Sequence, residues 1–281
     1  MNTATENLAD HTWLKIGGQA EIATPQSEED LVNLLRHCQE IDRPYRILGN
    51  GSNLLVSDDG VDELVIKTTE CCTSVDISED IVKAGASVMV PQFVSQLIEH
   101  DLGGYEFLYS VPGTIGGAIY MNAGRGKQHN KTIADHLLTV SFFDGTEIRT
   151  REKSELNFAY RYSIFHEHPN WVILSATFSP PEQPQEMGRK LAKERMEKVG
   201  KRERSKPNAG SVFKSGVRIP LGRIPPNGLS VDGARFVSSN RICHDGNATS
   251  KDVYRLVKLA QLVHRIVPPF SKPEIEWEIW K

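Results

Sequence analysis

The stretch Ser110–Gly117, which reads SVPGTIGG and is followed by AIYMNAG (Ala118–Gly124), decides the fold. Pro112–Gly113 predicts a tight turn, Thr114 offers a hydroxyl, and the glycine pair after it lets a ligand approach the backbone closely. A turn that serves structure alone rarely needs so many glycines before an apolar run that ends in Asn–Ala–Gly. We therefore predict a phosphate or nucleotide site, with contacts from Ser110, Pro112, Gly113, Thr114, Gly116, Gly117, Asn122, Ala123 and Gly124.

A second glycine-rich loop, LGNGSN at Leu48–Asn53, directly follows a predicted strand at Tyr45–Leu48. Glycine permits positive φ, so successive N–H groups can point into one concavity and bind an anion. The loop is not a GxGxxG motif, no helical pattern clearly follows it, and a plain Asn–Gly turn explains it equally well. Taken with the first stretch, it predicts a bound dinucleotide contacted by Leu48, Gly49, Asn50, Gly51, Ser52 and Asn53.

Hydrophobic spacing and turn residues divide the chain into three predicted domains, 1–67, 68–180 and 186–281. The boundary at 179–185 is the proline-rich stretch SPPEQPQ. One predicted helix begins at Ser27, which caps it, and stops before Arg43–Pro44; others lie at 91–100, at about 186–202 and from 250 to about 267. Predicted strands lie at 45–48, 64–67, 81–84, 137–143, 147–150, 171–178 and 210–213.

Composition excludes several classes of protein. The formal net charge is −3, so no global basic field favours nucleic acid. The sequence contains neither a secretory signal pattern nor an apolar run near the ~20 residues that span a bilayer, which favours a cytoplasmic protein without membrane contact. Its four cysteines form no CxxC pair, so no structural metal is expected. The basic run Lys198–Lys206 is interpreted as a solvated helix end, with contact to an anionic substrate such as a diphosphate as the alternative.

Further motifs make a family resemblance visible. They are HTWLKIGG (11–18), LGNGSNLLVSD (48–58), PGTIGGAIYMNAG (112–124), FAYRYSIF (158–165), NAGSVFK (208–214), GNATSKDV (246–253) and KPEIE (272–276). The chain resembles the UDP-N-acetylenolpyruvoylglucosamine reductases over nearly its whole length, and the short spacing between Phe165 and Asn208 resembles their compact subclass. The resemblance implies an α+β fold: a two-lobed FAD-binding domain of the vanillyl-alcohol-oxidase type and a C-terminal α+β substrate-binding domain.

The resemblance also implies a reaction. Such flavoenzymes take electrons from NADPH through FAD and reduce the enolpyruvyl ether of a UDP-sugar during peptidoglycan precursor synthesis. Arg161 matches the family's catalytic arginine, which grips the substrate carboxylate, and Ser211 matches its proton donor. Glu274 matches the C-terminal glutamate, with Glu276 and Glu278 as nearby alternatives. Substrate contacts are expected from Lys214 and Tyr160.

Departures from the family pattern cluster after Lys214, where Ser215–Gly216 replaces the usual Asn–Pro. Three prolines in Val217–Leu229 argue against a normal helix there. Arg125–Gly126–Lys127 replaces the usual Ala–Tyr–Gly. Open alternatives are therefore a paralogue that reduces another enol ether or unsaturated acid, an FAD oxidase of the same broader fold, and a non-catalytic flavin-binding module. Nothing indicates an oligomer, so a monomer is the default expectation.

Overall fold

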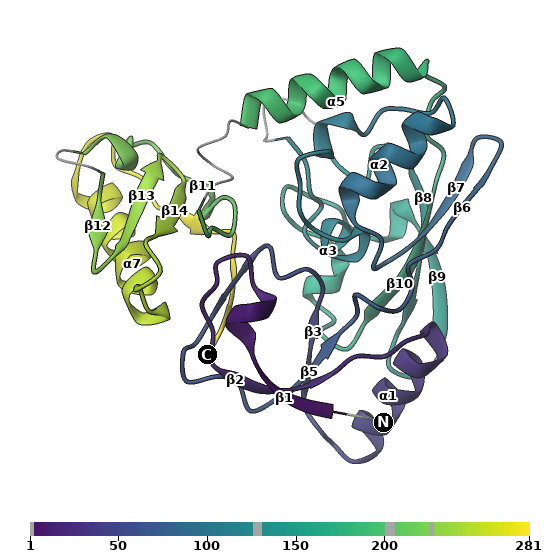
Figure 1. Ribbon diagram of the computed structural model, residues 1–281, viewed down its shortest axis with the longest axis horizontal. Coiled ribbons are helices and arrows are strands. Elements are labelled where there is room, and N and C mark those ends of the chain that lie inside the picture. Colours follow the sequence, from purple (N-terminus) through teal and green to yellow (C-terminus); the bar gives the residue numbers. More distant parts are fainter. Residues whose placement is uncertain (1–2, 126–130, 200–205, 225–227) are drawn as a thin grey trace. The chain divides into compact units, whose positions relative to one another are not determined.

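The computed structural model describes residues 3–125, 131–199, 206–224 and 228–281 (Figure 1). The chain forms two compact units. The first comprises Met1–Thr3, Ile22–Gly49 and Leu64–Lys201, and the second comprises Ala4–Glu21, Asn50–Glu63 and Arg202–Lys281. The loop Leu48–Asn53 is therefore divided between the units after Gly49.

A small α/β layer comes first along the chain. Its sheet has the order β1-β2-β5-β3, formed by β1 (Thr3–Asn7), β2 (Gln19–Ala23), β5 (Leu64–Lys67) and β3 (Tyr45–Leu48). β2 and β3 both pair in parallel with β5. The helix α1 (Glu28–Glu40) begins as predicted, because the Ser27 side chain accepts a hydrogen bond from the Asp30 N–H at 3.1 Å. Its apolar face buries Leu31 and Leu35 against Leu64 and Ile66.

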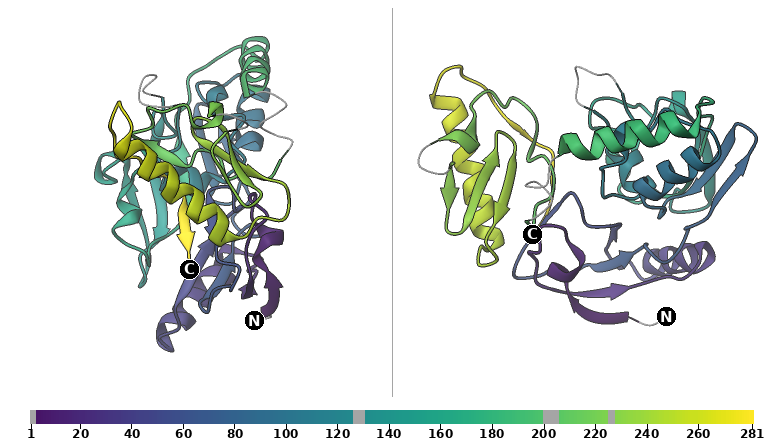
Figure 2. Two further views of the ribbon diagram at one scale, coloured as in Figure 1. Left: turned by 90° about the vertical axis from the view of Figure 1, so that its left-hand side faces the viewer. Right: turned by 45° about the horizontal axis from the view of Figure 1, so that its top comes forward.

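A five-stranded antiparallel sheet of order β6-β7-β10-β8-β9 forms the larger part of the first unit. Its strands are β6 (Val75–Ser78), β7 (Ile81–Gly85), β8 (Leu137–Phe143), β9 (Ile148–Glu152) and β10 (Val172–Phe178). The helices α2 (Val90–Glu99), α3 (Ile115–Tyr120) and α5 (Gln185–Val199) share a core with it (Figures 1 and 2). The predicted hairpin around Asp144–Gly145 is present, with its second strand at Ile148–Glu152 rather than 147–150.

The second unit consists of short strands around one long helix. The helix α7 (Ser250–Ile266) is capped by Thr249 and Asp252, and it buries Val253, Leu256 and Ala260. The strands are β4 (Leu54–Val56) parallel to β16 (Glu278–Trp280), β11 (Phe213–Ser215) antiparallel to β15 (Glu274–Ile275), and the antiparallel sheet β12 (Ser230–Val231), β13 (Ala234–Ser238) and β14 (Arg241–His244). Short 3-10 helices lie at Leu8–His11, Glu106–Leu108 (η2), Lys153–Glu155, Ile164–His166 and Leu221–Arg223.

The predicted strand at 210–213 is wrong in its position. β11 begins only at Phe213, because Gly210 has φ +70°, which interrupts extended backbone. The helix α3 went unpredicted, since two of its six residues are glycine and its helical propensity is low. Among the described residues of Val217–Leu229, no α-helix is found, as the prolines predict. Residues 200–205 of the basic run, together with Gly126, Lys127, Pro225 and Pro226, lie outside the described residues.

Within the described ranges, no helix is both long and apolar enough to cross a membrane. Within the same ranges, no group of three or more His, Cys, Asp or Glu side chains could hold a metal ion.

Gly51 gives the first prediction. It has φ +59°, and an added Cβ would lie 2.1 Å from the His11 carbonyl oxygen. Gly51→Ala should therefore lower the free energy of unfolding by on the order of 3 kcal/mol, combining backbone strain with a clash. Gly210→Ala is the matched control: its φ is +70°, yet nothing lies within 4 Å, so only strain of about 1–2 kcal/mol is expected. Equal destabilisation in urea denaturation would show that the close approach to His11 is unimportant.

Candidate flavin and reduction site

The two glycine-rich stretches meet inside the first unit. Gly49 follows β3, and a Cβ added there would lie 3.0 Å from the Thr114 hydroxyl oxygen. The Leu48 carbonyl accepts a hydrogen bond from the Thr68 N–H at 3.0 Å, which fixes the end of β3. Glycine at position 49 therefore allows the first stretch to lie directly against the second.

Backbone hydrogen bonds hold the second stretch against the turn that follows β7. The Gly113 carbonyl accepts from the Val90 N–H at 2.9 Å, and the Gly116 N–H donates to the Ala86 carbonyl at 2.7 Å. A Cβ at Gly116 would lie 3.1 Å from the Ala86 Cβ, so this glycine is required by packing rather than by a ligand. At Gly117 the nearest atom is the Thr114 hydroxyl at 3.5 Å, so only this second glycine leaves the open space predicted for the pair.

The remainder of the first loop, Asn50–Asn53, belongs to the second unit. The Gly51 carbonyl accepts from the Trp13 N–H at 3.0 Å. The Asn53 side-chain amide donates to the Glu276 carbonyl at 3.2 Å, and the Asn53 carbonyl accepts from the Glu278 N–H at 3.0 Å. The loop is therefore built together with the C-terminal strands, a contact that neighbouring residues in sequence do not indicate.

Two buried polar atoms beside these loops fit a bound polar ligand. The Thr69 hydroxyl and the Asn122 side-chain oxygen are buried and have no hydrogen-bond partner among the described residues. Thr69 follows Thr68, which binds Leu48, and Asn122 ends the second stretch. Since buried polar atoms are nearly always satisfied, these two are candidates for contact with a bound polar group. Thr69 is not among the residues that the sequence predicted, because no glycine pattern surrounds it.

Arg161 is held by the end of the second stretch. Its Nη2 donates to the Gly124 carbonyl at 2.8 Å and its Nη1 to the Asn122 carbonyl at 3.3 Å. The Asn122 amide in turn donates to the Ala159 carbonyl at 2.8 Å, two residues before Arg161. Both Asn122 (φ +41°) and Arg161 (φ +57°) have left-handed backbone, a conformation that residues other than glycine rarely adopt. Strain of this kind is typical of functional sites, where the surrounding structure fixes it.

Tyr160 lies beside this arginine. The Arg161 guanidinium carbon is 5.1 Å from the centroid of the Tyr160 ring, which is a cation–π contact. The ring thus adds a third restraint on the guanidinium beyond the two carbonyls.

Ser211, Lys214 and Glu274 come together in the second unit, whereas Arg161 belongs to the first. Lys214 lies on β11 and Glu274 on the paired strand β15, with Lys214 Nζ 3.6 Å from a Glu274 carboxylate oxygen. Ser211 is half-buried two residues before β11, and no hydrogen bond to its hydroxyl exists among the described residues. The Lys214–Glu274 pair is solvent-exposed, so it contributes little to stability, about 0–1 kcal/mol.

Other motifs of the resemblance converge in the second unit. A Cβ at Gly18 would lie 2.2 Å from the Asp58 carbonyl oxygen, so the first motif requires glycine where it meets LLVSD. The Asp58 carboxylate accepts from the Ser250 hydroxyl at 2.6 Å and the Ser250 N–H at 2.7 Å. His244 Nε2 lies 2.6 Å from the Leu14 carbonyl oxygen. These contacts explain why such distant segments share one pattern.

The perturbed cysteines and tyrosine near β3 are structural in character. The hydrogen bond between Cys71 and Cys72 lowers the pKa of the Cys71 thiol and raises that of Cys72, and burial raises the latter further. Burial, with a smaller contribution from Cys38, raises the pKa of Tyr45 to about 12. All four cysteines are free thiols.

Comparison with known proteins assigns the class and then the family. The FAD binding domain family matches residues 20–150, which include both glycine-rich stretches. The fold and these loops therefore define an FAD-dependent oxidoreductase. The UDP-N-acetylenolpyruvylglucosamine reductase from Thermus caldophilus superposes with a TM-score of 0.81, at 32% identity and with both chains fully covered.

Sequence relatives place the chain further. The UDP-N-acetylenolpyruvoylglucosamine reductase of Caldanaerobacter subterraneus subsp. tengcongensis is 34% identical over 271 residues, covering 92% of this chain and 87% of the relative. That of Geobacter metallireducens is 36% identical over 262 residues, covering 89% and 85%. The chain belongs to the UDP-N-acetylenolpyruvoylglucosamine reductase family.

Proposed function

We propose that this protein reduces the enolpyruvyl ether of UDP-N-acetylglucosamine enolpyruvate to UDP-N-acetylmuramate, with NADPH as the electron donor. Membership of the reductase family, with the chain covering most of each relative, carries the proposal. The anchored arginine at position 161 supports it, because the reaction develops negative charge that a guanidinium can stabilise.

FAD would be held by the two glycine-rich stretches, with Gly117 leaving room for it and Thr69 and Asn122 offering unpaired polar atoms. The chemistry that bound FAD would supply is hydride transfer, from NADPH to the flavin and from the flavin to the terminal alkene carbon of the substrate. Everything else the reaction needs comes from side chains that bind, orient and protonate the substrate.

Arg161 is assigned to the substrate carboxylate. Hydride addition leaves the ether-bearing carbon carbanion-like, and its charge delocalises into that carboxylate. A guanidinium presents five donors in a planar fork, of which two bind the Asn122 and Gly124 carbonyls. Because these bonds fix the guanidinium before substrate binds, the charge that develops in the transition state meets a pre-organised cation.

Ser211 is assigned as the proton donor to the same carbon. A serine hydroxyl is a weak acid, so it protonates only a strongly basic centre such as this carbanion. Glu274 orients Arg161 or, when protonated, donates to the developing enediolate, and Lys214 and Tyr160 bind the substrate. Lys214 Nζ lies 3.6 Å from a Glu274 carboxylate oxygen, so these two assigned residues are neighbours.

The alternatives have weaker support. A paralogue acting on another enol ether was motivated by the changes after Lys214, yet the relatives that share 34–36% identity are named as reductases of the same sugar nucleotide. A non-catalytic flavin module would not require the strained, anchored Arg161. We further propose that the protein works as a cytoplasmic monomer.

Identification of the product tests the proposal. The FAD-loaded protein should convert UDP-N-acetylglucosamine enolpyruvate and NADPH to a product that is heavier by two hydrogen atoms in mass spectrometry. Unchanged sugar nucleotide, together with NADPH oxidation driven by a different enol ether, would support the paralogue instead.

Asn122 gives a prediction that separates backbone strain from hydrogen bonding. Asn122→Ala should lower the free energy of unfolding by about 2–3 kcal/mol, through left-handed strain and a lost buried hydrogen bond. Asn122→Gly relieves the strain and loses only the hydrogen bond, about 1 kcal/mol. Both variants release the segment that carries Arg161, so substrate reduction should slow by roughly 10- to 100-fold. Activity retained in Asn122→Gly, measured by stopped-flow absorbance, would show that the amide does not position Arg161.

A further inference from the structure

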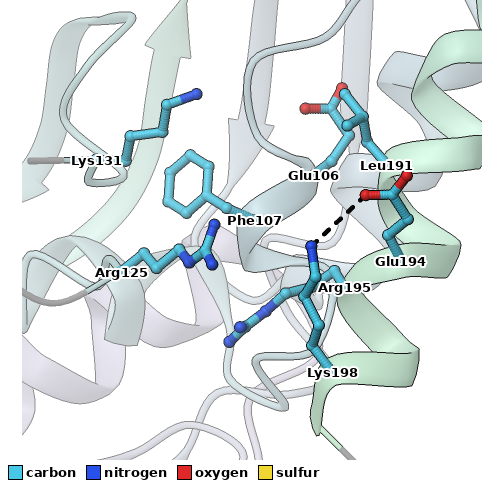
Figure 3. A pocket seen from close by; sticks show the side chains of 8 residues that line it. All are labelled: Glu106, Phe107, Arg125, Lys131, Leu191, Glu194, Arg195 and Lys198. Atoms are coloured by element: carbon cyan, nitrogen blue, oxygen red, sulfur yellow. Dashed lines mark ion pairs between the residues drawn. The ribbon is translucent and has the colours of Figure 1, made fainter. Parts of the chain in front are cut away.

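A cavity of about 180 Å³ lies within the first unit, and Arg161 is not one of its lining residues (Figure 3). Three elements contribute to it: η2, the backbone pair formed by residues 123–125 and 131–133, and α5. Its lining residues are Glu106, Phe107, Arg125, Lys131, Leu191, Glu194, Arg195 and Lys198. Ligand pockets for whole small molecules typically measure roughly 300–1,000 Å³, so this cavity suits one end group of a ligand rather than a complete nucleotide.

The backbone fixes Arg125 and Lys131 opposite each other. The Arg125 N–H donates to the Lys131 carbonyl at 2.9 Å, and the Ile133 N–H donates to the Ala123 carbonyl at 2.8 Å. Tyr105 anchors this pair, because its buried hydroxyl donates to the Ile133 carbonyl at 3.1 Å. Burial raises the pKa of Tyr105, so the hydroxyl remains a donor across the physiological range. Two cationic side chains are therefore presented from neighbouring, hydrogen-bonded backbone segments.

The helix α5 supplies the facing side. Leu191, Glu194, Arg195 and Lys198 recur at helical spacing and line the cavity together (Figure 3). Arg195 Nε donates to the Ser110 hydroxyl at 2.9 Å, so this face is tied to the start of the flavin stretch. In Figure 3 the Phe107 ring lies between the Arg125 and Lys131 side chains.

The charge of the lining favours an anion. Four cationic and two acidic side chains give a formal charge of +2 at pH 7. Glu194 is engaged by Lys198 at 3.6 Å, and the buried Glu106 accepts a hydrogen bond from the Gln183 amide at 2.5 Å. With Lys198 paired to Glu194, the surplus of positive charge in the lining rests on the arginine side chains and Lys131. Arginine beside lysine is the combination that recognises phosphoryl oxygens, through a planar fork and a point charge.

We propose that this cavity binds a phosphoryl group of a nucleotide, beside the flavin stretch. This proposal rests on the proposed function, under which two ligands carry such a group. They are the UDP-sugar, with its diphosphate, and NADPH, with its 2′-phosphate. Arg125, which stands where the family usually has alanine, would then contact this ligand.

Binding to the FAD-loaded protein tests the proposal without turnover, so it stands or falls independently of the reaction. UDP and adenosine 2′,5′-bisphosphate are titrated calorimetrically into the wild type, Arg125→Gln, Lys131→Gln and the double variant. Lys193→Gln is the matched control, since Lys193 is exposed on α5, does not line the cavity and undergoes the same change of charge.

We expect the double variant to weaken one probe by roughly 10- to 100-fold, the loss typical of charge-assisted hydrogen bonds, while Lys193→Gln stays within twofold. If the double variant loses affinity for UDP alone, the cavity is assigned to the sugar nucleotide. Loss of the bisphosphate alone assigns it to the 2′-phosphate, and NADPH should then lose its advantage over NADH. Wild-type affinity of the double variant for both probes, or an equal loss in Lys193→Gln, would overturn the proposal.

Discussion

Replacing Ser211 with alanine is expected to leave reduction of the flavin by NADPH unchanged and to slow its reoxidation by substrate by roughly 10²- to 10⁴-fold. The reason is that only the second half-reaction requires a proton at the ether-bearing carbon. The Ser211 hydroxyl is half-buried and has no hydrogen-bond partner among the described residues, so its removal should disturb the fold little. Anaerobic stopped-flow absorbance of the flavin measures the two half-reactions separately.

Two companion variants make this result specific. Ser211→Cys keeps an ionisable proton at the same position and should recover part of the lost rate. Ser230→Ala makes the same chemical change on β12, in the same unit, and should alter neither half-reaction. An equal loss in both half-reactions of Ser211→Ala would refute its role as proton donor.

The second large effect is expected at Arg161. Arg161→Gln removes the charge that stabilises the developing enediolate, so substrate reduction should slow by roughly 10²- to 10³-fold while flavin reduction by NADPH persists. Arg161→Lys keeps the charge but loses the fork that binds the Gly124 and Asn122 carbonyls, so it should restore only a minor part of the rate.

The control for this prediction is Arg189→Gln, because Arg189 is an exposed arginine on α5 in the same unit. Its flavin kinetics should match the wild type. A fully active Arg161→Lys variant would show that point charge alone suffices, and that the anchored orientation of the guanidinium is not used.

The parts of the fold that local chemistry determines were predictable. The helix α1 was expected from its Ser27 cap and apolar spacing, and β3 and β5 from short apolar runs with bounds that the structure reproduces. Such signals are complete within a few residues, so they need no knowledge of distant segments.

The parts that depend on distant contacts were not predictable. The parallel pairing of β4 with β16 joins residues more than two hundred positions apart, and nothing local indicates it. The anchoring of Arg161 by Asn122 likewise depends on tertiary structure. It also depends on the left-handed backbone of both residues, which no sequence motif indicates. Ser211 and Glu274 were singled out by family resemblance alone, and their assigned roles stay predictions. The cavity beside α5 could not be predicted from the sequence, because three segments that are separated along the chain form it.

The central claim is that one bound flavin takes electrons from NADPH and passes them to an enolpyruvyl sugar nucleotide. The most direct test mixes the purified FAD-loaded protein anaerobically with NADPH and then adds UDP-N-acetylglucosamine enolpyruvate while the flavin absorbance is followed. We predict that NADPH bleaches the flavin and that the sugar nucleotide rapidly restores its absorbance. A flavin that is bleached by NADPH and stays reduced after the sugar nucleotide is added would contradict the claim.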